Sequence, residues 1–151
     1  MEVSGRAFQG LSAATTVSVY ILIVLGGLVA STDSGLACPD WPLCNGQILP
    51  NLTVNVLIEF VHRLWTIEVT VAVVVTMLMA WKLYKRASKI TIFSTLTFIL
   101  LLTQIMLGML TVETRTLAVV VTAHLATATL LFACALMTCL VSFITPKGVS
   151  V

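Results

Sequence analysis

The sequence predicts an all-α integral membrane protein, namely a bundle of four membrane-spanning helices. Of its 151 residues, 59% are hydrophobic and only 9% are charged, whereas about 25% of the residues of a soluble domain are charged. The chain also contains four long apolar segments, each with the roughly 20 residues that a membrane helix needs. Together these observations exclude a soluble enzyme and a disordered chain. The net charge of +2 offers no basic face for a nucleic acid.

The four segments are expected to form a single membrane domain over residues 1–151. The second segment carries Glu59, His62, Arg63 and Glu68 but is as long and apolar as the others. The first is expected to stay as an uncleaved helix, because its apolar run exceeds the roughly 7–15 residues of a signal-peptide core. The expected helices are about 10–32, 56–81, 90–112 and 116–145.

The remaining long segment, residues 33–55, is expected to be a loop. It contains three of the four prolines and the turn pair Asn45-Gly46. Basic residues favour the cytoplasmic side of a membrane. Six of the basic residues lie on the cytoplasmic side in the following topology. It has both termini and the connection between the second and third helices in the cytoplasm, with residues 33–55 outside. The six residues are Arg6, Lys82, Lys85, Arg86, Lys89 and Lys147.

The four cysteines fall into two pairs with different expectations. Cys38 and Cys44 lie in the outer loop, where an oxidising compartment favours a structural disulfide. A redox-active pair is the alternative, and a metal site is disfavoured because the loop contains no histidine. Cys134 and Cys139 lie about 140° apart on the fourth helix, so they are expected to be unpaired, small buried side chains.

The two histidines of the chain, His62 and His124, both lie in expected membrane spans, where such residues are functional candidates by default. Each is about seven residues inside a helix that runs inward, so both lie roughly 10 Å below the outer surface. Two imidazoles at one depth can ligate a haem iron from both sides; interhelical hydrogen bonds are the alternative. A di-iron site built on Glu59 and His62 lacks the second such motif that it needs.

Three further charged residues lie in the second span. Arg63 is expected to meet a haem propionate through a charge-assisted bond. Glu59 is a candidate for stabilising positive charge in a low-dielectric site, and an i, i+4 pair with Arg63 is its structural alternative. Glu68 lies deep in the span with no basic residue at its depth. It is expected to meet a polar group of another helix or another protomer or, when protonated, a threonine such as Thr97.

Several motifs, taken together in this order, resemble the haem A synthase family. The outer loop with its two cysteines, followed by Glu-x-x-His-Arg, is the most specific part of the match, which covers essentially the whole chain. The matching stretches are Gly26-Gly27-Leu28-Val29, Thr32 to Gly46, Glu59-Phe60-Val61-His62-Arg63, Gln104-Ile105-Met106-Leu107-Gly108 and His124-Leu125.

The family usually has eight spans in two similar halves, and this chain resembles the N-terminal half. The resemblance therefore implies a compact form, multi-pass in the prokaryotic plasma membrane. A homodimer or higher homo-oligomer would restore eight helices. Its expected partners are the lipid bilayer, haem O, haem O synthase and an electron acceptor, with no nucleic acid.

The resemblance also implies an activity, the oxidation of the ring methyl of haem O to a formyl group. The product, haem A, serves terminal oxidases. By the same resemblance His62 and His124 would be the axial ligands of a haem iron, with haem b as cofactor and haem O as substrate. Glu59 would be the catalytic residue near the reacting edge, and Cys38 and Cys44 would shape or redox-couple the outer loop.

Two other classes of protein are left open by the residues. A four-helix membrane thiol–disulfide oxidoreductase would use Cys38 and Cys44 but gives the membrane histidines no role. A non-enzymatic bis-histidine cytochrome b uses both histidines but gives Glu59 no role.

Overall fold

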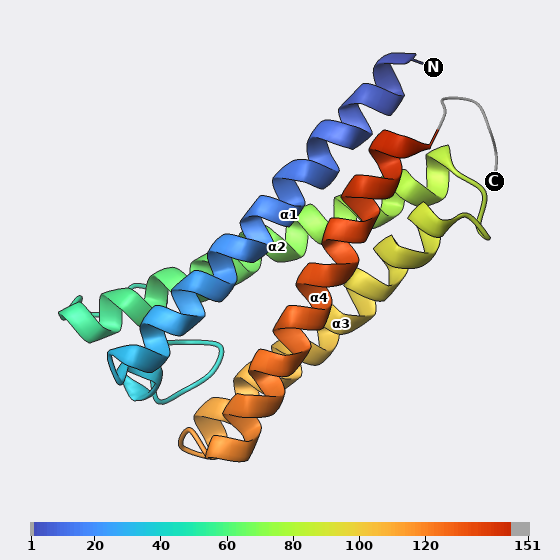
Figure 1. Ribbon diagram of the computed structural model, residues 1–151. Helices are drawn as coiled ribbons and strands as arrows, with labels where there is room; N and C mark the ends of the chain where they lie inside the picture. The colour runs from blue at the N-terminus through green and yellow to red at the C-terminus, as the bar shows by residue number, and fades with distance from the viewer. Residues whose placement is uncertain (1, 146–151) are drawn as a thin grey trace.

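Four long helices dominate the computed structural model, which describes residues 2–145 (Figure 1). All four are long and apolar enough to cross a membrane, so the predicted four-helix membrane bundle is confirmed. The first helix begins at Glu2 rather than near residue 10, and the described residues contain no strand. The helices are α1 (Glu2–Ser31), α2 (Val54–Leu83), α3 (Lys89–Glu113) and α4 (Ala118–Ile144), with a short 3-10 helix η1 (Ser34–Leu36) after α1.

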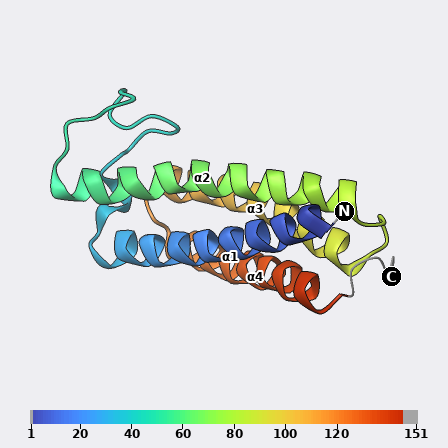
Figure 2. The same cartoon turned by 90° about the horizontal axis from the view of Figure 1, so that it is seen from above.

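The helices run up and down, and each packs along the ones before and after it, with α1 also along α4 (Figures 1 and 2). The bundle therefore has two distinct ends. The start of α1, the end of α4 and the α2–α3 connection lie at what we call the terminal end. Residues 32–53 and the tight α3–α4 turn lie at the opposite loop end. This arrangement agrees with the predicted topology, while its orientation in the membrane stays a prediction.

The half of the bundle at the terminal end is closely packed. Two apolar clusters fill it, one around Val19, Val69 and Leu101 and the other around Phe8 and Ile90. Polar side chains, two threonine hydroxyls and one glutamine amide among them, link the helices, as expected where lipid gives no hydrophobic drive for association. The bonds are Thr15 Oγ1 to Thr76 Oγ1 at 2.9 Å, Thr16 Oγ1 to Ala135 O at 3.1 Å and Gln9 Nε2 to Ser142 O at 2.8 Å.

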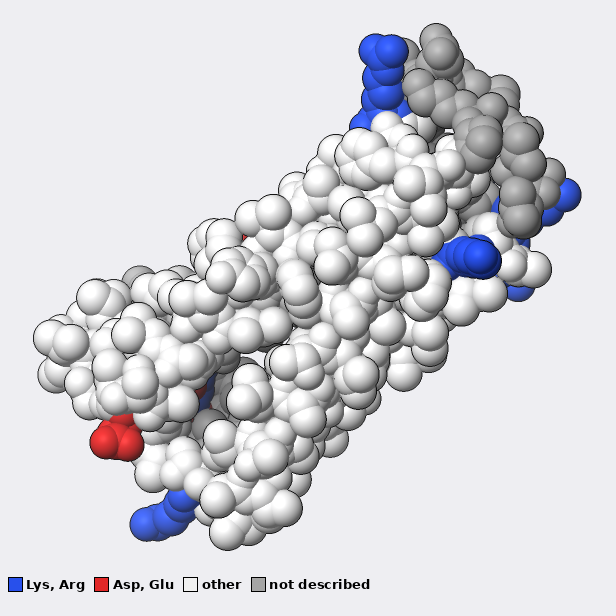
Figure 3. All heavy atoms as spheres, in the orientation of Figure 1, with Lys and Arg blue, Asp and Glu red and all other residues white. Residues whose placement is uncertain are grey.

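The half at the loop end is open. In the helical residues 20–31, 54–68, 102–113 and 118–130, only Val56 and Glu59 are buried. Figure 3 shows a hollow between α1 and α4 in this half, with acidic and basic atoms visible inside it. The helices are thus closely packed at the terminal end and leave internal space at the loop end, where both histidines lie.

Candidate functional site: two histidines, a buried ion pair and a disulfide loop

His62 lies near the start of α2 and faces α1. A Cβ atom added at Gly26 of α1 would lie 3.3 Å from Cε1 of the imidazole, so the ring edge lies directly against this glycine. The Nδ1 atom of His62 is buried and has no hydrogen-bond partner. This nitrogen therefore does not form the interhelical hydrogen bond that was the alternative to haem ligation.

His124 lies near the start of α4 in a matching position. A Cβ atom added at Gly108 of α3 would lie 3.5 Å from its Cε1 atom, and its Nδ1 atom is also buried without a partner. Each pair of consecutive helices thus supplies one glycine and one histidine, at similar depth from the loop end.

Glu59 is one of the two buried helical residues of the open half, with 5% of its surface exposed. Its Oε1 atom lies 2.7 Å from Nε of Arg63, one turn further along α2. The i, i+4 pair predicted as the structural alternative is therefore present. Removing one partner of a buried ion pair leaves an uncompensated charge, which is strongly destabilising.

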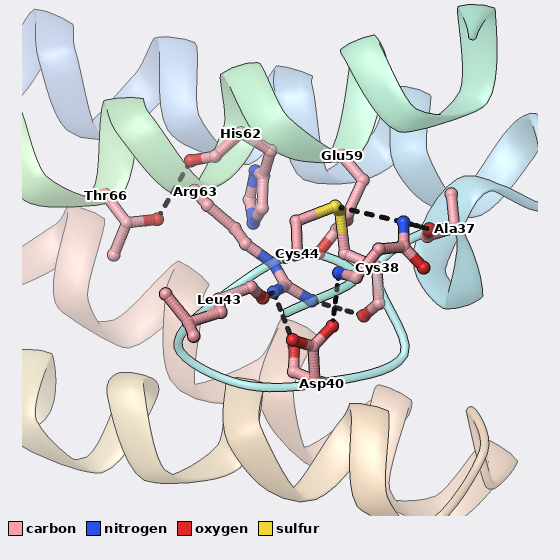
Figure 4. A network of polar contacts seen from close by, with 10 residues as sticks. Ala37, Cys38, Asp40, Leu43, Cys44, Glu59, His62, Arg63 and Thr66 are labelled. Atoms are coloured by element: carbon pink, nitrogen blue, oxygen red, sulfur yellow. Dashed lines mark hydrogen bonds and ion pairs between the residues drawn. A yellow bond between two sulfur atoms is a disulfide. The ribbon is translucent and has the colours of Figure 1, made fainter. Parts of the chain in front are cut away.

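Arg63 connects this ion pair to the outer loop. Its Nη1 atom donates to the carbonyl oxygens of Asp40 (2.7 Å) and Leu43 (2.6 Å), and its Nη2 atom donates to that of Cys38 (2.7 Å). Figure 4 shows the guanidinium surrounded by the loop backbone. Four of the five N–H donors of Arg63 are therefore engaged, which leaves one N–H of Nη2 for a propionate contact.

The loop itself is closed by the predicted disulfide between Cys38 and Cys44, and both residues are buried. Asp40 accepts hydrogen bonds from the backbone amides of Gly46 (2.8 Å) and Asn45 (2.6 Å). These bonds, that from Gly46 foremost, and the nearby Arg63 charge lower the pKa of Asp40 below its ordinary value of 3.8. The loop is therefore a small ordered unit, and its carbonyl groups are fixed where Arg63 needs them.

Other predicted residues lie outside this cluster. Glu68 is exposed on the bundle surface and accepts a hydrogen bond from Ser18 Oγ at 3.3 Å. The Thr97 alternative is wrong, because Thr97 is buried in the terminal half and donates to its own helix at Phe93 O. Cys134 is half-buried and Cys139 is buried, and neither is bonded, as predicted.

Three residues near the histidines were missed as site residues in the sequence. Gly26 and Gly108 lie against the rings. The sequence feature that could have indicated them is a glycine inside an apolar helix, because such a glycine costs about 1 kcal/mol relative to alanine. Gln104 is the third. Its Oε1 atom is buried without a hydrogen-bond partner, and it lies one turn from Gly108, on the same face of α3.

The ligand set of this site suits a porphyrin better than a bare metal ion. Residues 2–145 contain no group of three or more histidine, cysteine or acidic side chains that could hold an ion. A haem iron takes four ligands from its macrocycle and needs only one or two from the protein. Two imidazoles with unpartnered nitrogens beside an open internal space fit that requirement.

The fold and the site define a four-helix membrane protein with two internal histidines beside a disulfide-bearing loop. The family model described as cytochrome oxidase assembly protein (COX15-CtaA) matches residues 9–56 and 52–148. The chain belongs to this family.

Curated relatives in the family agree over almost the whole chain. Proteins named Heme A synthase from Bacillus cereus, Bacillus anthracis and Bacillus thuringiensis are each 32% identical over 145 residues. The match covers 94% of this chain and 47% of each relative. The chain thus spans about half the length of the curated relatives it matches. With its four candidate spans, it is a multi-pass protein of the prokaryotic cell membrane.

Proposed function

We propose that the protein is a haem A synthase, an oxidoreductase that converts the ring methyl of haem O to the formyl group of haem A. The observation that carries this proposal is the pair of imidazoles with unpartnered nitrogens, set against Gly26 and Gly108, next to the buried Glu59. The relatives from Bacillus are named Heme A synthase, which supports haem A as the product.

His62 and His124 would hold the haem iron, one from each pair of helices. A Cβ atom at Gly26 would lie 3.3 Å from the His62 ring and would displace it slightly, whereas one at Gly108 would lie 3.5 Å from the His124 ring, an ordinary contact. The open half that contains both histidines has a hollow between α1 and α4 (Figure 3). Bound there, haem b or haem O would supply the iron of the site. Converting a methyl to a formyl group removes four electrons and adds one oxygen atom, so the reaction also requires an electron acceptor and an oxygen source, water or dioxygen.

Glu59 would act on the reacting edge of haem O. A carboxylate in a low-dielectric site stabilises positive charge that develops on a nearby carbon, and removing such a group costs about 10²–10³ in rate. Arg63 is a positioning residue in this scheme. It holds Glu59 through Nε while its two terminal nitrogens are fixed by the loop carbonyls.

The outer disulfide would serve this arrangement structurally. Cys38 Sγ and Cys44 Sγ are bonded within a buried cluster, and exchange needs a thiolate with access to the disulfide sulfur. That burial disfavours the thiol–disulfide oxidoreductase. The burial of Glu59 favours the synthase over a bis-histidine cytochrome, which has no use for a buried acid.

Co-expression with a haem O synthase tests the proposal. The purified protein should carry haem, and extraction followed by chromatography should show haem A together with haem O. Haem b alone would indicate a cytochrome. A colourless protein with thiol-exchange activity would indicate the oxidoreductase, and either result would overturn the proposal.

Loss of the disulfide is expected to weaken the loop without stopping the reaction. Closing so short a loop contributes about 2 kcal/mol, so Cys38→Ser/Cys44→Ser should lower the thermal midpoint in detergent while haem A still forms. Cys134→Ser is the matched control and should change neither property. Normal haem content and stability with no haem A would contradict this and indicate redox chemistry at the pair.

Gly26→Ala is expected to disturb the His62 ligand. The new Cβ atom would lie 3.3 Å from the ring, so the imidazole must shift, and the absorption maxima of the bound haem should move or the haem content fall. Gly27→Ala is the control, because a Cβ atom there meets nothing within 4 Å. Identical spectra for the two variants would remove Gly26 from the site.

We also propose that the working unit is a homodimer or a higher homo-oligomer. Glu68 lies on the surface of a membrane helix with only Ser18 as partner among the described residues, and an ionisable side chain facing lipid is costly. Glu68→Leu should therefore shift the mass in mild detergent from oligomer to monomer, whereas Glu113→Gln, at the end of α3, should not. An active, haem-loaded monomer of the unmodified protein would contradict this.

A further inference from the structure

A groove at the terminal end lies outside the histidine site and has no role in the reaction. It has a volume of about 330 Å³ and opens between the end of α2 and the start of α3. This volume is within the range of small-molecule sites. Its walls are Trp81, Arg86, Thr91, Ile92, Thr95 and Leu96.

Trp81 is a fixed wall of this groove. Its indole Nε1 donates to Thr95 Oγ1 at 2.9 Å, and Thr95 Oγ1 in turn donates to Thr91 O at 2.7 Å. The ring is therefore held against α3 although 48% of the residue is exposed. A partly exposed tryptophan near the end of a membrane helix is typical of the boundary between the headgroups and the hydrocarbon of a bilayer.

The mouth of the groove is positively charged. Arg86 lies there, with Lys82, Lys85 and Lys89 close to it in the chain, and residues 69–112 contain no acidic residue. The structure gives Arg86 no ion pair within residues 2–145. Figure 3 shows basic atoms at this end and no acidic ones on the visible face. Any counter-ion of Arg86 must therefore come from outside the described chain.

Part of the remaining wall, next to Thr91 and Thr95, is apolar. Ile92 and Leu96 lie one turn apart on the same face of α3, and they are 46% and 40% exposed. A ligand that uses the whole groove therefore has an anionic group at one end and a hydrocarbon chain beside it. A free phosphate ion would leave the apolar wall unused.

We propose that this groove binds an anionic phospholipid of the surrounding bilayer, with the phosphate on Arg86 and one acyl chain along Ile92 and Leu96. An arginine guanidinium can hold a phosphate through two parallel hydrogen bonds. Basic pockets between membrane helices bind anionic headgroups in this way. The site is at the opposite end of the bundle from His62, so lipid binding anchors the packed terminal half and leaves the haem site free.

Native mass spectrometry of the haem-loaded protein in mild detergent tests this site. Added phosphatidylglycerol should remain bound through the spectrometer, and phosphatidylcholine should be lost more readily. Arg86→Gln should weaken phosphatidylglycerol binding on the order of tenfold, the effect of losing one charge-assisted contact. Arg6→Gln is the matched control, since Arg6 is an exposed basic residue of α1 near the same end that does not line the groove.

Leu96→Gln separates the two halves of the site, because it alters only the apolar wall. It should weaken phosphatidylglycerol binding while the haem spectrum and helix content stay unchanged. The proposal is overturned if the unmodified protein binds both lipids equally, or if Arg86→Gln behaves like Arg6→Gln. It is also overturned if inorganic phosphate displaces the lipid completely, since the groove would then bind a free anion.

Discussion

His62→Ala and His124→Ala are each expected to abolish the low-spin spectrum of a haem held by two histidines. The chain contains only these two histidines, so neither loss can be replaced by a neighbouring imidazole. Each ring presses against a glycine of the preceding helix, and no other ligating side chain joins them to form a larger group in residues 2–145. Absorption spectra of the purified variants, normalised to protein, measure the effect.

A folding defect is distinguished from ligand loss by a second substitution. His62→Met keeps a side chain that can ligate iron. This variant should therefore retain a low-spin haem spectrum with shifted maxima, whereas His62→Ala should have no low-spin spectrum. Circular dichroism should show the same helix content for both. An alanine variant with full haem content and an unshifted low-spin spectrum would remove that histidine from the ligand set.

Glu59→Ala is expected to retain haem while haem A formation falls about 10²–10³-fold, the usual cost of removing a preorganised electrostatic group. The carboxylate is buried, and within residues 2–145 its only charged partner is Arg63. The arginine keeps its three bonds to loop carbonyls in the variant, so the loop should stay in place. Haem extraction and chromatography after co-expression with haem O synthase measure the product.

Two comparisons make this result specific. Glu59→Gln keeps the shape and a hydrogen-bond acceptor for Arg63 but lacks the charge, so it should be nearly as inactive as the alanine variant. Glu113→Ala is the control for loss of an acidic residue outside the site. Normal haem A from Glu59→Gln would show that the residue only holds Arg63, as its i, i+4 pairing alone would require.

Much of this architecture was predictable from the sequence because it depends on short-range properties. Segment length and apolarity determine the four helices, and prolines and turn residues determine the loop between α1 and α2. The spacing of Cys38 and Cys44 allowed their disulfide, and the distance of each histidine from its helix start gave the matched depth. The start of α1 at Glu2 was missed, because polar residues at a membrane boundary continue a helix as readily as they end it.

The tertiary structure alone decided which side chains meet across the chain. Arg63 bonds to carbonyl groups more than 20 residues earlier, Ser18 rather than Thr97 meets Glu68, and Gly26 and Gly108 lie against the histidines. These contacts depend on the rotation of each helix about its axis and on its neighbours, and nearly uniform apolar segments carry little pattern to fix either. The packed terminal half and the open half containing the histidines arise from that same helix packing.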